Sequence, residues 1–371
     1  MKIDTFALER YFAKHEFSAR YLLSSSDCES LSLAGLLEMA DEETEELWDG
    51  LKLGYTESQG HPLLRQEIAA IYESIRPQEV LVLALEEGIY LLMLALLSAG
   101  DHLICTFPGY QSLYEVARSL GCQVSLWQPD ESQGWRFDLD WLRETLHQDT
   151  RLVVTNFPHN PTGHLPEVDW YREMVEIVGA HGAYLLSDEM YRFLEFGERQ
   201  TLPAGCYLYE RAVSLCGLSK SFGLPGLRIG WVAAQDSGVL AKMAELKDYT
   251  TICSSAPSEI LALVALRNRG RIVKEQLQRL HCNLILMEQF FRDRSDIFAW
   301  NRPGGGSVCF PRMLTVENTH GFCESLVAET GIMLAPSSVF QFGNAHVRIG
   351  FGRQDLAEVL GLFGKYLDSA L

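Results

Sequence analysis

The chain has 371 residues, of which 47% are hydrophobic, and a formal net charge of -18 at pH 7. This length and apolar content suffice for a sizeable core and suggest about two domains. The acidic balance argues against nucleic acid and anionic membranes as partners, and it is compatible with a cationic small molecule.

The first 45 residues are predicted to form an N-terminal arm. They lack the basic start, apolar core and small-residue cleavage site of a secretory signal, so we expect a cytoplasmic protein. Within the arm we expect a short helix over residues 6–14, a polar loop around Asp27 and a further helix that begins near Ser32.

Strand-like and helical patterns alternate from residue 80 onward. Apolar runs of strand character occupy residues 80–84, 102–106, 123–126, 152–156, 183–187, 212–216 and 229–233. Most of these runs are separated by helical patterns, which is typical of an α/β domain with a mainly parallel sheet. The most apolar segment, residues 80–99, is interrupted by two glutamates and a glycine, so it predicts a strand, a turn and a helix and no membrane span.

The pattern changes in the C-terminal third of the chain. A long amphipathic helix is expected from about residue 265, followed by strands at 308–310, 332–334 and 347–351 and a closing helix from Gln354. We therefore expect an arm at residues 1–45 that shares the small domain, a large domain at 46–265 and a small α+β domain at 266–371. Nine singly spaced cysteines predict neither a disulfide framework nor a metal site.

Lys220 lies in a bend directly after the apolar run at residues 212–216. Two glycines and a proline follow it and prevent a regular helix there. Partial burial behind a strand lowers the pKa of such an amine and makes it a usable nucleophile toward an aldehyde. Arg228, further along the bend, offers a planar fork suited to a phosphate.

The run from Ser219 to Trp231 reads Ser-Lys-Ser-Phe-Gly-Leu-Pro-Gly-Leu-Arg-Ile-Gly-Trp. It resembles the pyridoxal-phosphate lysine signature of the class I and II aminotransferases, which are fold type I enzymes. The resemblance implies that Lys220 forms the Schiff base with the cofactor and acts as the catalytic base, while Ser219 and Arg228 hold the phosphate. It also implies a large α/β domain with a mainly parallel seven-stranded sheet and a smaller α+β domain.

Further residues that match the family follow predicted strands, where ligands collect in an open α/β sheet. The resemblance places Asp188 at the pyridine nitrogen of the cofactor, where a carboxylate keeps the ring protonated. It gives Tyr191 and Asn160 hydrogen bonds to the ring oxygen, and it lets Tyr110 stack on the ring. His159 is interpreted as a turn residue, because the motif lysine already supplies a base.

The cofactor phosphate is expected at the start of the helix that follows residues 80–84. Free backbone N–H groups and the positive end of the helix dipole suit an anion there. The predicted contacts are the amides near Glu86, Glu87 and Gly88, with both glutamate side chains directed away. This stretch and Gly217 lack hydroxyl side chains that many family members carry, which leaves more of the binding to the lysine motif or to a partner subunit.

Two other segments match family residues that bind ligands. Residues 54–65 resemble the segment whose tyrosine crosses a dimer interface to the neighbouring phosphate, which assigns that role to Tyr55 and implies a two-fold homodimer with shared active sites. Arg348 matches the arginine that binds the α-carboxylate of the substrate as a bidentate pair, beside Asn160. The expected substrate is an L-amino acid.

The side chain of the substrate should meet the N-terminal arm, which folds over the pocket in this family. The arm offers Asp27, Glu9, His15 and Glu16, and no arginine is placed to receive a second carboxylate. Paired acids suit a guanidinium or ammonium group, although Asp27 in its serine-rich loop would serve equally as a turn cap. Both interpretations of Asp27 stay open at this point.

The arm and the lysine motif are also similar to the capreomycidine synthase-like branch, whose members dehydrate and cyclise a hydroxylated arginine. We predict such a cyclase, with an aminotransferase for a basic or apolar L-amino acid as the alternative. A DNA-binding regulator that carries this domain is disfavoured, because the family-like region begins by about residue 20 and the chain is acidic. A non-catalytic binding protein is disfavoured because Lys220, Asp188 and the other cofactor residues are present.

Overall fold

The computed structural model describes residues 2–197 and 201–371, and a seven-stranded sheet lies at its centre with the order β1-β7-β6-β5-β4-β2-β3. Its strands are β1 (Val80–Leu83), β2 (His102–Thr106), β3 (Gln123–Trp127), β4 (Thr150–Asn156), β5 (Tyr184–Asp188), β6 (Ala212–Gly217) and β7 (Gly230–Ala234). Strand β7 is antiparallel to both of its neighbours, and the other adjacent pairs are parallel. The predicted mainly parallel sheet is confirmed.

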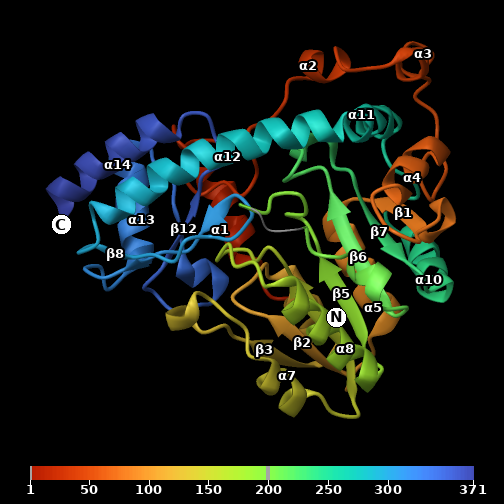
Figure 1. Cartoon of the computed structure of the whole chain (residues 1–371), viewed down its shortest axis with the longest axis horizontal. Helices are drawn as coiled ribbons and strands as arrows, with labels where there is room; N and C mark the ends of the chain where they lie inside the picture. The colour runs from red at the N-terminus through yellow and green to blue at the C-terminus, as the bar shows by residue number, and fades with distance from the viewer. Residues whose placement is uncertain (1, 198–200) are drawn as a thin grey trace.

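Helices cover both faces of this sheet (Figure 1), which explains why its strands read as apolar runs. These helices are α4 (Pro62–Ala69), α5 (Leu85–Leu96), α6 (Ser112–Ser119), α7 (Leu139–Thr145), α8 (Val168–His181), α9 (Gly205–Leu208), α10 (Ser237–Lys247) and α11 (Ala256–Arg267). Leu81 and Leu83 of β1 pack in the cluster of α5, α6 and α10, whereas Val80 and Val82 pack with α4 and α11 on the opposite face. This alternation buries every residue of the strand.

The C-terminal region begins with the long helix α12 (Arg269–Arg292). Its other elements are β8 (Phe298–Ala299), β9 (Val308–Cys309), β10 (Arg312–Met313), α13 (Thr319–Thr330), β11 (Ala335–Pro336), β12 (Val347–Gly350) and α14 (Leu356–Ala370). Strands β11, β12 and β9 form one antiparallel sheet, and β10 pairs with β8.

The strand expected at residues 332–334 is wrong. Ile332 forms only an isolated bridge to Tyr21, and β11 begins at Ala335. Residues 332–334 are apolar because all three are fully buried, and burial does not require a ladder. The division of the chain at residues 45 and 265 stays a prediction.

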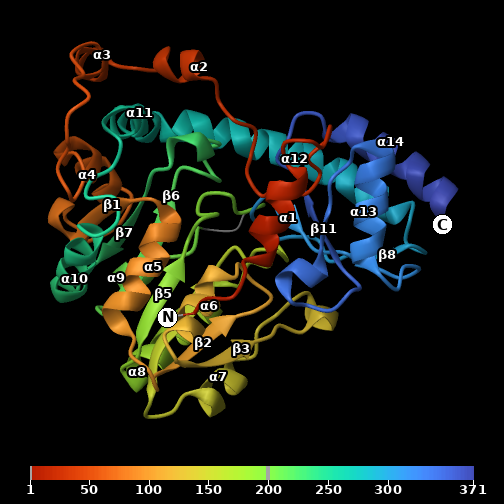
Figure 2. The ribbon, with the colours of Figure 1, turned by 180° about the vertical axis from the view of Figure 1, so that it is seen from behind.

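The N-terminal arm contains α1 (Ala7–His15), α2 (Leu33–Leu37) and α3 (Glu42–Asp49). The helix expected near Ser32 is thus two short helices, and Ser32 and Asp41 cap them by accepting hydrogen bonds from backbone amides. Figures 1 and 2 both show α1 between the large sheet and the C-terminal elements. The amide of Ala7 donates to Gln111 Oε1 at the start of α6, at 2.9 Å.

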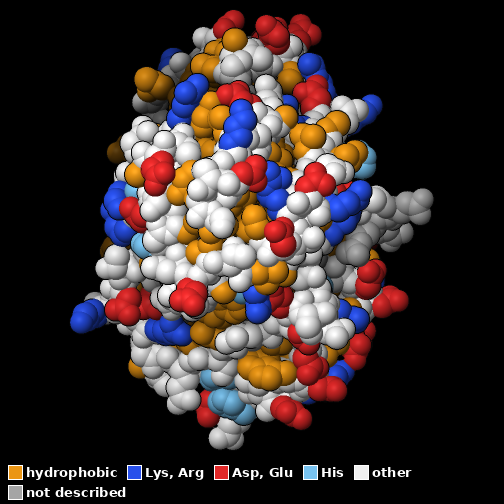
Figure 3. Space-filling view, turned by 90° about the vertical axis from the view of Figure 1, so that its left-hand side faces the viewer, with side chains coloured by type: hydrophobic (Ala, Val, Ile, Leu, Met, Phe, Trp, Pro, Cys, Tyr) orange, Lys and Arg blue, Asp and Glu red, His pale blue; other side chains and the backbone are white. Residues whose placement is uncertain are grey.

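Four short 3-10 helices complete the chain: η1 (Pro77–Glu79), η2 (Glu131–Gln133), η3 (Pro225–Leu227) and η4 (Ser337–Phe340). Figure 3 shows acidic and basic side chains interspersed with small hydrophobic areas on the face that carries the C-terminal region. In the two described stretches of the chain, no helix has both the length and the apolar character needed to cross a bilayer.

Candidate active site

A cavity of about 410 Å³ lies where the ends of three sheet strands meet α1 and the loop that contains Ser26. Asn156 and Asp188 are the last residues of β4 and β5, and Lys220 follows the end of β6 at Gly217. Because parallel strands end at the same edge of a sheet, these three separate segments bring their polar side chains together.

Lys220 lies in the predicted bend after β6. Its Nζ donates a hydrogen bond to Ser26 Oγ at 2.8 Å. Burial lowers the pKa of the Lys220 amine; the Asp27 carboxylate opposes this shift and the Arg348 guanidinium adds to it. A lower pKa leaves more of the amine neutral and therefore nucleophilic toward an aldehyde.

Asp188 is buried at the end of β5. One of its carboxylate oxygens accepts a hydrogen bond from the Met190 amide at 3.1 Å, and Asn156 Nδ2 donates to its carbonyl oxygen at 3.2 Å. Burial raises the pKa of Asp188 to about 7, and the Met190 amide opposes this shift. A buried carboxyl group of this kind can share a proton with a ring nitrogen.

Arg348 reaches the cavity from β12 and is only 2% exposed. Its Nε and Nη2 donate to the Ser24 carbonyl oxygen at 3.2 and 2.9 Å, and its Nη1 donates to Asn160 Oδ1 at 3.2 Å. The Asn160 amide in turn donates to Asn156 Oδ1 at 2.8 Å. The fold thus holds together the two side chains that were predicted to bind the substrate carboxylate.

The phosphate end of the predicted cofactor fits this cavity. Ser219 Oγ is buried, and it has no hydrogen-bond partner among residues 2–197 and 201–371. Such an orphaned hydroxyl costs free energy that a bound acceptor recovers. Arg228 lines the same cavity, and its Nη1 donates to the Pro225 carbonyl at 3.0 Å. A free hydroxyl beside a lysine and a guanidinium suits the phosphate and aldehyde groups of pyridoxal phosphate.

Two glycines near this end have no room for a side chain. A Cβ on Gly217 would lie 2.9 Å from Gly230 Cα and 3.0 Å from Leu85 Cδ2, so a serine at this position would crowd the β7 backbone and Leu85. A Cβ on Gly88 would lie 2.8 Å from Leu83 Cδ1, which shows that Gly88 packs α5 against β1. The Gly88 amide donates to the Ala84 carbonyl oxygen at 2.9 Å, so its predicted contact with the phosphate is corrected. The predicted shortage of side-chain donors therefore has a steric cause.

The two glutamates at the start of α5 point in different directions. Glu87 turns away from the cavity, because its carboxylate accepts from the Ala84 amide at 3.3 Å and from Thr251 Oγ1 at 2.8 Å. Glu86 lines the cavity, so the expectation that both side chains point away is corrected. Burial raises the pKa of Glu86 to about 7, and the nearby Ser112 hydroxyl opposes this shift. A protonated carboxyl group there does not repel an anion.

Two tyrosines line the cavity with their hydroxyl groups engaged. Tyr110 donates to Glu9 Oε1 at 2.6 Å, and this bond ties α1 to the ring that was predicted to stack on the cofactor. Tyr191 donates to the Ser26 carbonyl oxygen at 2.9 Å. A hydroxyl group has one hydrogen to donate. The predicted bond from Tyr191 to the cofactor oxygen would therefore replace the bond to Ser26 or share its hydrogen.

His15 requires a correction, because it lies outside the cavity. Its Nε2 is 2.9 Å from Glu324 Oε1 of α13. The helical period places Glu9, Phe12 and Glu16 on one face of α1, and all three line the cavity. His15 falls on the adjacent face and anchors the end of α1 to the C-terminal region.

Asp27 also lines the cavity. Its two carboxylate oxygens lie 3.2 and 3.0 Å from Arg353 Nη2. The carboxylate thus already faces one guanidinium, which favours an ion-pairing role over that of a turn cap. Tyr55 is 88% exposed and lies outside the cavity of its own chain, and its role in a neighbouring subunit stays a prediction.

Sequence reasoning missed several residues that line the cavity or position those that do. They are Phe12, Ser26, Asn156, Met190 and Arg353. Helical spacing from Glu9 could have identified Phe12, and the serine-rich loop already singled out for Asp27 contains Ser26. Arg353 carried no signal, because its partner is 326 positions away in the sequence.

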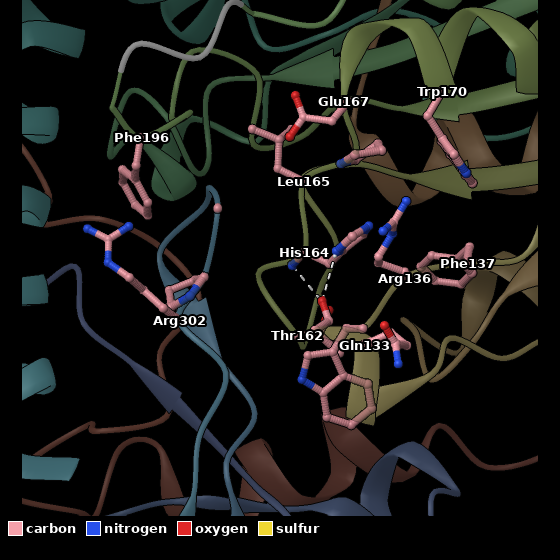
Figure 4. Close-up of a pocket in the computed structure, with 15 residues that line it drawn as sticks. Gln133, Arg136, Phe137, Thr162, His164, Leu165, Glu167, Trp170, Phe196 and Arg302 are labelled. Atoms are coloured by element: carbon pink, nitrogen blue, oxygen red, sulfur yellow. Dashed lines mark hydrogen bonds between the residues drawn. The ribbon is translucent and has the colours of Figure 1, made fainter. Parts of the chain in front are cut away.

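A second cavity, of about 480 Å³, shares none of its lining residues with the first. Figure 4 shows Arg302 and Phe196 on one side of it and His164, Arg136 and Phe137 on the other. It contains no residue that the sequence predicted for the active site, so the chemistry is assigned to the first cavity.

Known proteins resemble this chain over almost its whole length. A model of the aminotransferase class I and II family matches residues 21–360. Capreomycidine synthase of Streptomyces vinaceus is 32% identical over 352 residues, which cover 93% of this chain and 88% of that protein.

Two solved structures share the fold of this chain over its whole length. A PLP-dependent aminotransferase from Streptococcus suis has a TM-score of 0.93 and 31% identity, covering 100% of this chain and 99% of its own. The PLP-dependent cyclase OrfR has a TM-score of 0.91 and 27% identity, with the same coverage of 100% and 99%. The protein is an enzyme with a fold type I architecture, and its cofactor is pyridoxal phosphate. The chain belongs to the class I and II aminotransferase family.

Proposed function

We propose that this enzyme dehydrates and cyclises a hydroxylated L-arginine to a cyclic guanidino amino acid. The charge distribution in the cavity carries the proposal. Among the described residues that line it, the basic ones are Lys220, Arg228 and Arg348. The cofactor aldehyde, its phosphate and the substrate α-carboxylate require all three. The charged groups left on the arm are acidic, which suits a cationic side chain and disfavours a dicarboxylic amino acid.

The named relatives support the same reaction class. Capreomycidine synthase is 32% identical to this chain, and OrfR, which is described as a cyclase, has a TM-score of 0.91. OrfR covers 100% of this chain, so the structural similarity includes the arm as well as the sheet.

Each catalytic role falls on a residue in the cavity. Pyridoxal phosphate, when bound, supplies an aldehyde for the substrate amine and a ring that accepts electrons from Cα. Arg348 and Asn160 bind the α-carboxylate and orient the Cα–H bond. Lys220 Nζ removes the proton from Cα and holds it. Asp188 keeps a proton at the ring nitrogen, which favours that removal.

The hydroxyl group on Cβ then leaves with its bonding electrons, a double bond forms between Cα and Cβ, and the proton held by Lys220 Nζ completes a molecule of water. A nitrogen of the guanidino group adds to Cβ and closes the ring; the proton it loses passes to Lys220 Nζ, which returns a proton to Cα. The sum is substrate minus one water, with the α-amino group retained. The arm has to hold the guanidino group, which is where the acidic side chains of α1 and its following loop lie.

Mass spectrometry tests the proposal. The holoenzyme is incubated with β-hydroxy-L-arginine and no 2-oxo acid. A product lighter by one water that keeps its α-amino group is the expected result, and the Lys220→Ala variant is the control that forms none. A substrate that stays unchanged until an amino acceptor is added, and then becomes a 2-oxo acid, overturns the cyclase.

The second candidate is an aminotransferase for a basic or apolar L-amino acid. The similarity to the Streptococcus suis aminotransferase, at 31% identity, favours it. Removal of the Cα proton by Lys220 is common to both reactions. The two differ in where Lys220 Nζ delivers that proton, so the acceptor dependence described above separates them.

The proposal includes a homodimer in which Tyr55 reaches the phosphate of the neighbouring subunit. Tyr55, Leu53 and Tyr249 are 88%, 87% and 90% exposed. Thr56 Oγ1 donates to the Ser254 carbonyl at 3.3 Å, which brings the two exposed segments together. Large exposed apolar side chains in one area are typical of an interface. Sedimentation should give a dimer, and a monomer that binds the cofactor normally would contradict it.

A further inference from the structure

The geometry assigns to Glu16 the selection of a cationic side chain in the substrate. This inference rests on the proposed binding of an L-amino acid in the first cavity, and it does not depend on cyclisation. Glu16 is the C-cap residue of α1 and lines the cavity together with Phe12 and Glu9, one and two turns earlier on the same face. It is half-buried, so its carboxylate is partly withdrawn from water.

The other two carboxylates of the arm that line the cavity already have partners. Glu9 accepts a hydrogen bond from the Tyr110 hydroxyl at 2.6 Å. Asp27 forms an ion pair with Arg353 at 3.0 Å. Glu16 forms no side-chain hydrogen bond or ion pair with any residue in the described parts of the chain, 2–197 and 201–371. It is therefore the carboxylate of the arm that remains free for a ligand.

The charges around Glu16 strengthen this assignment. Burial raises the pKa of Glu16, the carboxylates of Asp27 and Glu9 raise it further, and Arg353 and Lys220 oppose them. A guanidinium placed beside Glu16 would gain a charge-assisted hydrogen bond and relieve the repulsion among the three acids. A neutral side chain of the same shape would leave the carboxylate unpaired, and an acidic one would be repelled.

The cavity also has the boundaries that an amino acid with a long side chain needs. Arg348 fixes the α-carboxylate at one end, and Lys220 Nζ must lie next to the Cα proton. Glu16 lies on α1, and α1 bridges the large sheet and the C-terminal region through Gln111 and Glu324. This double anchoring fixes the position of the helix end from which the Glu16 side chain extends.

The experiment measures exchange of the Cα proton with deuterium from solvent, in the holoenzyme, for L-arginine and L-citrulline. The two amino acids have nearly the same shape, but the ureido group of citrulline is neutral. Exchange needs Cα proton removal alone, so it reports binding and orientation for a cyclase and an aminotransferase alike. The wild-type enzyme should prefer L-arginine in kcat/KM.

The Glu16→Gln variant should lose about 10-fold to 100-fold in kcat/KM for L-arginine, because a charge-assisted bond is replaced by a neutral one. The loss should appear mainly in KM, and citrulline exchange should change less than about threefold, within the effect of a neutral hydrogen bond. Glu16→Asp, which keeps the charge, should retain part of the preference. Glu45→Gln, on an exposed position of α3, is the control for net charge and should leave both substrates unaffected.

Several outcomes overturn the assignment. They are an equal loss for both amino acids in Glu16→Gln, an unchanged preference for arginine, or a wild-type enzyme with no preference. Failure of the proposed function looks different, because exchange would then depend on Glu16 while hydroxylated arginine gave no dehydrated product. Thermal unfolding of Glu16→Gln and Glu16→Asp distinguishes loss of the charge from loss of the fold.

Discussion

The cofactor half and the substrate half of the cavity are built in different ways. The cofactor half consists of residues at or just after the ends of β4, β5 and β6, and their positions are fixed by the hydrogen-bonded ladder of the sheet. The substrate half consists of one face of α1 and the loop of Ser26 and Asp27, which tertiary contacts alone hold in place. The rigid half supplies chemistry that the family shares, and the arm can change specificity without disturbing it.

The largest effect on turnover is expected from a substitution in the cofactor half. Lys220→Ala removes the base and the group that binds the cofactor aldehyde, so turnover should fall by at least about 10³-fold. The absorbance of the bound cofactor should change as well, because its bond to the lysine is lost. Full turnover with unchanged absorbance would show that another residue carries the chemistry.

The second largest effect is expected at Arg348, which lies between the cofactor half and the substrate half. Arg348→Lys removes the planar fork for the α-carboxylate, which should lower kcat/KM for L-amino acids by about 10-fold to 100-fold. Because Arg348 also donates to the Ser24 carbonyl, the variant should unfold at a lower temperature. A matched amine that lacks the carboxylate serves as the control substrate, and equal losses for both would remove Arg348 from the carboxylate site.

Ser219→Ala should affect the cofactor without affecting the cofactor-free fold. Ser219 Oγ is buried without a partner in the described residues, so its removal should not lower the thermal unfolding temperature of the apoenzyme. Affinity for pyridoxal phosphate should fall by about 10-fold, since a hydrogen bond to a charged acceptor is lost. Titration of the apoenzyme by absorbance measures this, and an unchanged affinity would place the phosphate elsewhere.

The smallest effect concerns Glu86, whose pKa burial raises from 4.5 to about 7. Between these values the folded apoenzyme holds a proton that the unfolded chain has lost, so this contribution to stability falls as pH rises through that window. The protonated form also tolerates phosphate, so cofactor affinity should decrease above about pH 7.

Glu86→Gln should flatten this pH dependence. Pyridoxal, which lacks the phosphate but carries the same ring, is the control for the contribution of Asp188, whose pKa burial also raises to about 7. If the wild-type enzyme and Glu86→Gln show the same pH profile for pyridoxal phosphate, Glu86 does not face the phosphate.

The difference between the cofactor half and the substrate half also explains how much of the site the sequence could predict. All seven strands of the large sheet lie within two residues of their expected positions, because each is an apolar run that alternates with helices. The residues at or just past the ends of those strands, such as Asp188 and Lys220, could therefore be placed together. Gly217 was recognised as unusual, but the steric reason, its contact with Gly230 and Leu85, became visible only in the structure.

The arm was less predictable, because long-range contacts determine which side chains face the cavity. His15 was named together with Glu16, although the helical period of α1 places only Glu16 on the face of Glu9. The pairing of Asp27 with Arg353 and the bond from Lys220 to Ser26 join distant parts of the sequence and leave no local pattern. The direction of the Glu86 side chain likewise depends on burial, which a helix start alone does not reveal.

A crystal structure of the Lys220→Ala variant with pyridoxal phosphate and L-arginine tests the central claim most directly, because it shows both halves of the cavity in use. We predict the α-carboxylate on Arg348, the ring nitrogen at Asp188 and the guanidinium within hydrogen-bond distance of Glu16. A guanidinium that points away from α1, with Glu16 still unpaired, would contradict the account.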